Sequence, residues 1–161
     1  KLIRPQLNAL STPEDVSRRI TTMAVKVYSS QVAGLKADII DVEVDLSQGL
    51  HSFSIVGLPD KAVEESKDRI SAAIKNSGFV SPQKKNQRVT ISLAPADLKK
   101  EGPSFDLSIA LAYLLASKQI FFDSSGKVFF GELALDGKLR AKKGALALVK
   151  NAKKAGFKEV L

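Results

Sequence analysis

Apolar and polar residues alternate along three segments near the start of the chain. The alternation begins at Val25, is clearest over residues 38–46, where acidic and apolar residues interleave, and returns over 52–56. A period of two is typical of strands that bury one face. Because short links such as Gln48-Gly49 join the segments, we expect the three strands to form an antiparallel meander.

Two later segments have the spacing of helices. Pro59 suits the first position of a helix whose apolar residues share one face and which Gly78 ends. A strand is predicted over 88–93. Apolar residues cover most of the circumference of a second helix over 104–117, so we expect this helix to be central and buried.

The last third of the chain is predicted to form a hairpin, a helix and a final strand. Strands over 127–135 and 138–141 flank an Asp136-Gly137 turn. A helix over 144–154 and a strand over 157–161 follow. The predicted order is β-β-β-α-β-α-β-β-α-β. Because strands and helices do not alternate strictly, we expect an α+β fold with helices packed on a mixed sheet.

The first 22 residues do not share this patterning. Thr12 can cap a short helix, which is predicted over 13–21. Met23 has the position of a translation start, so we expect 1–22 to be an N-terminal extension, either upstream sequence or an addition from cloning. The domain is then 23–161. Because the chain ends in an apolar strand without a tail, we expect it to be a fragment of a longer protein.

The composition is that of a globular domain in a reducing compartment. The 161 residues are 44% apolar and 26% charged, which suits one domain with a core of its own. No apolar run approaches the roughly 20 residues that a membrane helix needs, and no signal-peptide pattern opens the chain. Cysteine is absent, which excludes disulfides, and we expect a cytoplasmic protein. The single histidine, His51, is predicted to be a loop or edge residue.

The charge points toward an anionic partner. Lys and Arg number 25 against 17 Asp and Glu, a net charge of +8. Nucleic acid is the usual partner of such a chain, although a solvated lysine face is the alternative. Phosphate contacts are predicted at the two ends of the 88–93 strand, about 20 Å apart. The residues concerned are Lys84, Lys85 and Arg88 at one end and Lys99 and Lys100 at the other. Because the phenylalanines have an apolar context, we expect contacts with phosphates that are independent of sequence.

Motifs for nucleotide and metal chemistry are missing from the sequence. Gly126-Lys127 is followed by Val128 and not by a hydroxyl residue, so there is no Walker A loop, and this chain alone should not hydrolyse ATP. The acidic residues of the 38–46 segment alternate along a strand, so we interpret them as its solvent face and expect no metal site.

Ser104 is the one candidate for catalysis. It is expected at the start of the buried helix, where a hydroxyl is typically a cap, and we favour that interpretation. The alternative is a hydrolase in which Ser104 is the nucleophile and Lys99 or Lys100 is the base.

The stretch Gly102-Pro103-Ser104 before a buried helix, followed by 131–140 and by Ala155-Gly156-Phe157, resembles the proteolytic domain of Lon proteases. The resemblance implies a Lon-protease-like fold, similar to domain 2 of ribosomal protein S5. It also implies a serine nucleophile with a lysine base on the following helix. The lysine position falls on Leu148, which cannot accept a proton, and Lys150 points roughly 200° away around the helix. Ser104 is therefore expected to be vestigial, with no catalytic residue in this chain.

A second set of segments, in order over 24–161, resembles the N-terminal domain of the competence protein ComM family of bacterial magnesium-chelatase-like AAA+ ATPases. The segments are Gly34-Leu35, Val42-Glu43-Val44-Asp45, residues 49–60, residues 72–79, Leu93-Ala94-Pro95-Ala96-Asp97-Leu98, residues 100–107 and Gly131-Glu132-Leu133. The resemblance implies a following AAA+ module that binds ATP and magnesium, a homo-hexamer, and a helicase that drives DNA branch migration during natural transformation and recombination.

These resemblances lead to one hypothesis and two alternatives. The chain is expected to be a non-catalytic domain, without cofactor of its own, that assembles, positions or loads the DNA motor. The alternatives are a serine hydrolase or peptidase that uses Ser104, and a protein-interaction domain without DNA contact. The magnesium-chelatase label reflects similarity in the ATPase module and is not expected to describe an activity of this chain.

Overall fold

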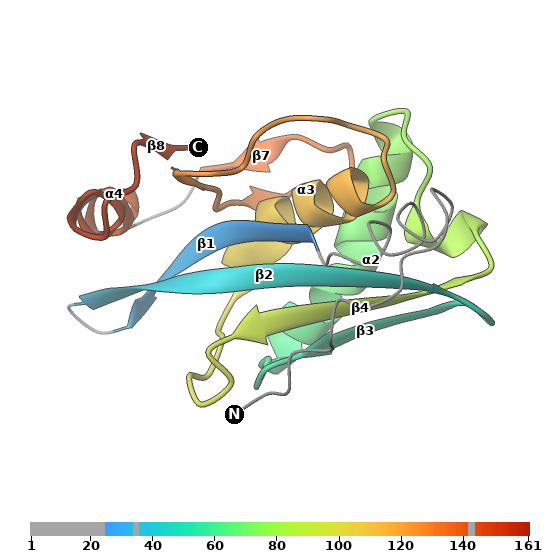
Figure 1. The fold of residues 1–161 in the computed structure, drawn as a ribbon, viewed down its shortest axis with the longest axis horizontal. Helices are drawn as coiled ribbons and strands as arrows, with labels where there is room; N and C mark the ends of the chain where they lie inside the picture. Colours follow the sequence, from blue (N-terminus) through green and yellow to red (C-terminus); the bar gives the residue numbers. More distant parts are fainter. Residues whose placement is uncertain (1–24, 34–35, 142–143) are drawn as a thin grey trace, which may run out of the picture.

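A computed structural model describes residues 25–33, 36–141 and 144–161. A six-stranded sheet in the order β3-β4-β2-β1-β5-β8 carries the helices, and β6 and β7 form a separate two-stranded sheet (Figure 1). The elements are β1 Val25–Ala33, β2 Lys36–Gln48, β3 Ser52–Val56, α2 Lys61–Asn76, η1 Pro82–Lys84, β4 Gln87–Ala94, η2 Pro103–Phe105, α3 Asp106–Ala116, β5 Lys127–Val128, β6 Glu132–Leu133, β7 Leu139–Arg140, α4 Ala145–Lys154 and β8 Glu159–Val160. The helix predicted over 13–21 lies outside the described residues.

The sheet mixes parallel and antiparallel neighbours, as expected, but its order corrects the predicted meander. β1 and β2 form an antiparallel hairpin in which Val27 is opposite Val42. β3 does not pair with β2, because β4 lies between them, antiparallel to β2 and parallel to β3. Parallel neighbours need a crossover connection, and α2 supplies it between β3 and β4. The short link after β2 therefore does not make a hairpin.

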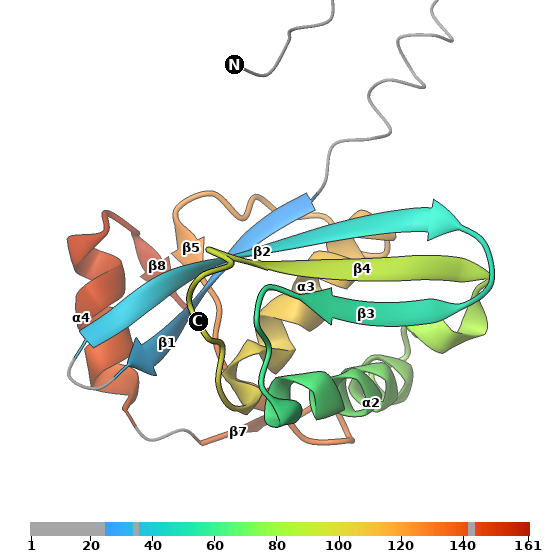
Figure 2. The same ribbon diagram turned by 90° about the horizontal axis from the view of Figure 1, so that it is seen from below.

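The predicted alternation along the second strand is confirmed. Ile40, Val42 and Val44 are buried in the core, while Glu43 is half-buried and Asp45 is exposed on the opposite face. Figure 1 shows α3 packed over one face of the sheet, and Figure 2, seen from below, shows the strands in front of this helix. No helix in the described ranges covers the face that carries the acidic residues.

The two long helices occur where the apolar spacing predicts them. α2 begins after Asp60, whose carboxylate accepts a hydrogen bond from the N–H of Val63 at 2.8 Å, so Asp60 is the N-cap. Pro59 therefore lies just outside the helix. In α3, Ile109 and Tyr113 are fully buried, which confirms a central helix. This helix is preceded by the 3-10 turn η2 and is shorter at its start than predicted.

The strand predicted over 127–135 is two short strands in different sheets. β5 runs parallel to β1, and β6 pairs with β7. The chain leaves the large sheet between Phe129 and Gly131. The N–H of Phe129 bonds to the carbonyl of Tyr28 in β1, whereas the N–H of Gly131 bonds to the carbonyl of Ser104 in η2. α4 confirms the last predicted helix, and β8 extends the edge of the sheet beside β5.

Candidate functional site

Three of the predicted phosphate contacts lie together at one end of β4. Lys84 ends η1, Lys85 follows it, and Arg88 is the second residue of β4. All three side chains are exposed, and none makes an ion pair with another residue in the described part of the chain. We call these three residues the basic end.

The backbone around the basic end is held by short-range hydrogen bonds. The N–H of Lys84 donates to Ser81, the N–H of Gln87 donates to Lys85 at 2.8 Å, and the N–H of Gly49 donates to Asn86 at 3.4 Å. The link between β2 and β3 therefore lies beside the η1–β4 turn. Three cations are thus presented from a constrained turn, a geometry that suits contact with successive phosphates.

Lys99, at the other end of β4, is exposed but already paired. Its ammonium lies 2.9 Å from the carboxylate of Glu101. The hydrogen bond with Glu101 raises the pKa of Lys99 above its usual value. An exposed pair of this kind contributes little to stability, so Lys99 can leave Glu101 and bind a phosphate instead.

Lys100 lies in the interior, which corrects its place among the predicted phosphate contacts. Its side chain is 0% exposed, and its ammonium donates a hydrogen bond to the carbonyl of Pro95. Burial lowers the pKa of Lys100 because the charged form loses its hydration. A side chain so placed cannot reach a ligand on the surface.

Backbone hydrogen bonds explain why Lys100 points inward. Its N–H donates to Leu58 at 3.0 Å, and its carbonyl accepts from the N–H of Asp60 at 2.9 Å. On the other side, the amide of Gln31 donates to the carbonyl of Lys99 and accepts from the N–H of Glu101. The segment is thereby tied to β1 and to the start of α2. A Lys-Lys doublet carries no sign of this arrangement in its sequence.

Ser104 is not the helix cap that its position predicts. It lies inside η2 and is 1% exposed, and its hydroxyl has no hydrogen-bond partner among the described residues. Leu148, at the position of the Lon-type base, is fully buried in α4, and Lys150 on the same helix is exposed. Because the Ser104 hydroxyl has no hydrogen-bond partner among the described residues, none of Lys99, Lys100 and Lys150 bonds to it as a base.

The start of α3 is held by an ion pair that the sequence reasoning missed. Asp106 is 0% exposed and lies 3.0 Å from Nε of Arg69 on α2, which is 24% exposed. Its carboxylate also accepts from the N–H of Leu133 in β6 at 3.2 Å. Burial raises the pKa of Asp106, against the opposing effect of Arg69. An acid at the first position of an apolar helix was the available signal, and its partner lies 37 residues away.

The chain does not provide a site for a nucleotide phosphate at Gly126-Lys127. The ammonium of Lys127 lies 2.6 Å from Glu159, and Val128 is fully buried in β5. Over the residues that the structure describes, no cluster of three or more potential metal-ligating side chains occurs. Among the described residues, Gly126-Lys127 therefore offers a nucleotide phosphate neither an unpaired ammonium nor a following hydroxyl.

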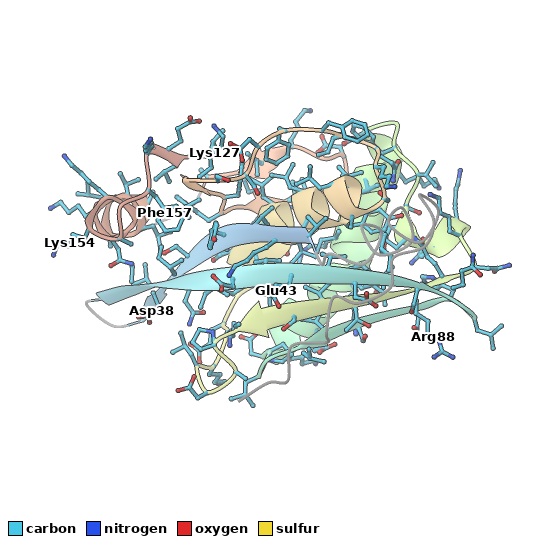
Figure 3. All side chains as sticks on the ribbon, viewed as in Figure 1. Asp38, Glu43, Arg88, Lys127, Lys154 and Phe157 are labelled. Atoms are coloured by element: carbon cyan, nitrogen blue, oxygen red, sulfur yellow. The ribbon has the colours of Figure 1, made fainter. Side chains whose placement is uncertain are left out.

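A second basic group, on α4, was not among the predicted contacts. Lys150, Lys153 and Lys154 are exposed and form no ion pair with another described residue. Figure 3 shows Lys154 and Arg88 at opposite ends of the molecule. By contrast, Lys138 and Arg140 are paired with Asp136 and Glu132.

Comparison with known proteins places these features in a family context. Residues 42–161 match the family described as subunit ChlI of Mg-chelatase. The uncharacterised protein YifB of Escherichia coli (strain K12) is 44% identical over 136 residues, which is 84% of this chain and 26% of that protein. The competence protein ComM of Haemophilus influenzae is 43% identical over 130 residues, which is 80% of this chain and 25% of that protein.

A more distant relative is the uncharacterised protein Rv2897c of Mycobacterium tuberculosis, which is 37% identical over 137 residues, 84% of this chain and 27% of that protein. The chain thus spans about a quarter of the length of the curated relatives that it matches. Within the described ranges, none of the helices combines the length and the apolar character needed to cross a membrane.

Proposed function

This chain belongs to the family described as subunit ChlI of Mg-chelatase, and we propose that it is a non-catalytic N-terminal domain of a magnesium-chelatase-like AAA+ ATPase. The whole protein then acts as a DNA helicase in branch migration during natural transformation and recombination. The similarity to a competence protein supports this proposal. The domain assembles, positions or loads the motor and makes phosphate contacts with DNA.

The proposal includes the finer fold and the organisation of the longer protein. The mixed sheet, with Ser104 just before a buried helix, supports a Lon-protease-like fold similar to domain 2 of ribosomal protein S5. Residues 23–161 form this domain, and 1–22 are an extension of it. ATP and magnesium bind to a separate AAA+ module, through which the cytoplasmic protein forms a homo-hexamer.

The observation that carries DNA contact is the basic end. Its three cations are exposed and form no ion pair with a described residue, so no existing partner must be displaced when a phosphate binds. Phosphate contacts of this kind release condensed counterions and are independent of sequence. Lys99 can add a fourth contact only by leaving Glu101.

The test compares two variants of equal charge. Fluorescence anisotropy measures binding of labelled single-stranded, duplex and four-way-junction DNA to the chain. The basic-end variant, Lys84→Ala/Lys85→Ala/Arg88→Ala, is expected to bind about tenfold or more weakly. The control variant, Lys150→Ala/Lys153→Ala/Lys154→Ala, removes the same charge from the opposite end of the molecule and is expected to lose much less.

The other outcomes separate the alternatives. Equal losses in the two variants would mean that total charge, and not the basic end, attracts DNA. Absence of binding by the unmodified chain even at low salt would favour an interaction domain without DNA contact. The hydrolase alternative requires Ser104 to react, and its burial leaves a serine-directed probe no access. Labelling of Ser104 by such a probe would therefore contradict the non-catalytic proposal.

A further inference from the structure

A small polar cavity lies next to the basic end. Its volume is about 210 Å³, it is partly open to solvent, and it is lined by the start of β3, the middle of α2 and η1. Figure 2 shows β3 running beside α2 at this edge of the sheet. The cavity is smaller than the roughly 300–1,000 Å³ of sites for drug-sized ligands, so its size suits a single ring system.

The polar groups that line the cavity are not used by the fold. His51, Ser52, Asp68 and Gln83 are exposed, and their side chains form no hydrogen bond with another described residue. Ser71 is 4% exposed, and its hydroxyl also lacks a partner among the residues that the structure describes. Because the Ser71 hydroxyl has almost no accessible surface, the exposed groups of the lining are the ones that a ligand can reach.

The chemistry of the lining favours a neutral ligand over an anion. The carboxylate of Asp68 would repel a phosphate inside the cavity, and the ammonium of Lys67 is already engaged with Glu64 at 2.5 Å. The Asp68 carboxylate, the Gln83 carboxamide and the Ser52 hydroxyl instead match the donors and acceptors on the edge of a nucleobase. Phe53, which is half-buried in the same lining, adds an aromatic ring against which a base can pack.

The cavity and the basic end are adjacent in the chain and in the sheet. Gln83 directly precedes Lys84 and Lys85 in η1. Ser52 lies opposite Arg88 in the parallel pairing of β3 with β4. Lys84 and Lys85 therefore lie next to the cavity along the chain, whereas Arg88 alternates with the buried Val89 and points to the opposite face of the sheet.

We propose that this cavity receives one unpaired base of single-stranded DNA while Lys84 and Lys85 hold a neighbouring phosphate. The inference rests on the proposed DNA contact and adds to it a preference for unpaired strands. A base inside a duplex is stacked and cannot enter, so single strands, or unpaired bases at a junction, are the ligands that use the cavity.

The experiment separates base recognition from phosphate attraction. Anisotropy is measured for a labelled single-stranded oligonucleotide of mixed sequence and for an abasic oligonucleotide with the same number of phosphates. The chain is expected to bind the abasic strand about tenfold more weakly, which is typical of the loss of one base contact. The basic-end variant is expected to bind both strands more weakly.

Variants of the exposed lining test the cavity itself. His51→Ala/Gln83→Ala is expected to lower the affinity for the ordinary strand to that for the abasic strand, and to leave abasic binding unchanged. The matched control is Ser47→Ala/Gln48→Ala, two exposed residues at the end of β2 outside the cavity. Asp68→Asn removes a negative charge, so simple attraction predicts tighter binding, whereas the cavity predicts weaker binding of the ordinary strand.

Three results would overturn the inference, and they are distinguishable. Equal affinity for ordinary and abasic strands, with weaker binding by the basic-end variant, would remove the base site and keep the proposed DNA contact. Binding of neither strand at low salt would remove both. If the cavity variants weaken both strands equally, the lining residues do not recognise a base.

Discussion

Lys100 places an ammonium group in the interior with one carbonyl as its hydrogen-bond partner. Burial lowers its pKa in the folded state, whereas the unfolded chain keeps the usual value of 10.5. As the pH rises toward that value, the folded state releases its proton first, so the unfolded state binds more protons. Stability therefore increases with pH in the window below 10.5.

This linkage predicts the behaviour of Lys100→Met, which removes the charge and keeps an unbranched side chain. The free energy of unfolding of the unmodified chain should rise relative to that of the variant as the pH increases from neutrality toward 10.5. Urea unfolding of both proteins at several pH values measures the difference. A difference that stays constant with pH would show that burial does not destabilise the charged form of Lys100.

The pair Arg69 and Asp106 predicts an asymmetry between its two members. Arg69→Met leaves a fully buried carboxylate uncompensated, and we expect it to cost about 3–5 kcal/mol near neutral pH. Asp106→Asn leaves a partly exposed guanidinium that water can solvate, so its cost should be smaller. Unfolding by urea, compared between Arg69→Met, Asp106→Asn and the unmodified chain, checks the order.

The pH dependence of Arg69→Met follows from the raised pKa of Asp106. A carboxyl group whose pKa is raised on folding binds more protons in the folded state, so stability falls as the pH rises through its titration. Loss of Arg69 removes the group that opposes this rise. The variant should therefore recover part of its lost stability at mildly acidic pH, and a deficit that is equal at acidic and neutral pH would contradict the argument.

Two lysine doublets show what sequence alone can and cannot reveal about the site. Lys84-Lys85 and Lys99-Lys100 are identical doublets flanking one strand, and both were predicted to contact phosphate. The first lies on an exposed turn, whereas backbone bonds to Leu58 and Asp60 turn Lys100 inward. Local polarity predicts exposure, but partners that lie about 40 residues away decide it.

At the scale of elements, the crossover from β3 to β4 depends on a close approach at Gly57. This residue has a φ of +104°, and a Cβ placed there would lie 2.0 Å from the carbonyl oxygen of Leu93 in β4. Gly78, at the end of α2, has a φ of +86° but no atom within 4 Å of a built Cβ. The two glycines thus share a positive φ, which strains any other residue, and differ in crowding.

We expect Gly57→Ala to lower the free energy of unfolding by about 3 kcal/mol or more, from strain and overlap together. Gly78→Ala, its control, should cost about 1–2 kcal/mol from the left-handed backbone alone. Thermal and urea unfolding of both variants measure the difference. Equal costs would mean that the backbone at Leu93 moves away from the new Cβ without loss of stability.

Periodicity predicts the elements of this fold better than their connections. The alternation in β2 reflects one buried face, and the apolar sequence of α3 reflects burial on most sides of the helix. Both patterns are local in the sequence. The parallel pairing of β3 with β4, and the break of the predicted 127–135 strand, are not local. They depend on α2 packing against α3 and on the bond from Gly131 to Ser104.

At the scale of the whole molecule, two groups of exposed cations without ion pairs to described residues lie at opposite ends. The basic end and the lysines of α4 lie far apart, and the exposed face of β2 between them carries acids such as Glu43, labelled with Arg88 and Lys154 in Figure 3. A net charge of +8 therefore does not describe a uniform surface. A nucleic acid can reach one end without lying along the acidic strand.

This separation of charge predicts how salt affects DNA binding. Each phosphate contact contributes a slope of about −0.9 for duplex DNA, or about −0.7 for a single strand, to the dependence of log affinity on log salt. Removing the three cations of the basic end should therefore make the slope shallower by about 2 to 3. The α4 variant, which loses the same charge, should keep its slope, because residues that do not touch phosphate release no condensed counterions.

Anisotropy titrations of the three proteins over about 50 to 200 mM salt measure these slopes. The slope is a stronger test than a single affinity, because general attraction to a positive protein and direct contact with phosphate can give the same affinity at one salt concentration. If both variants flatten the slope equally, phosphate contacts are not confined to the basic end. If only the basic-end variant does so, phosphate contact is assigned to the turn between η1 and β4.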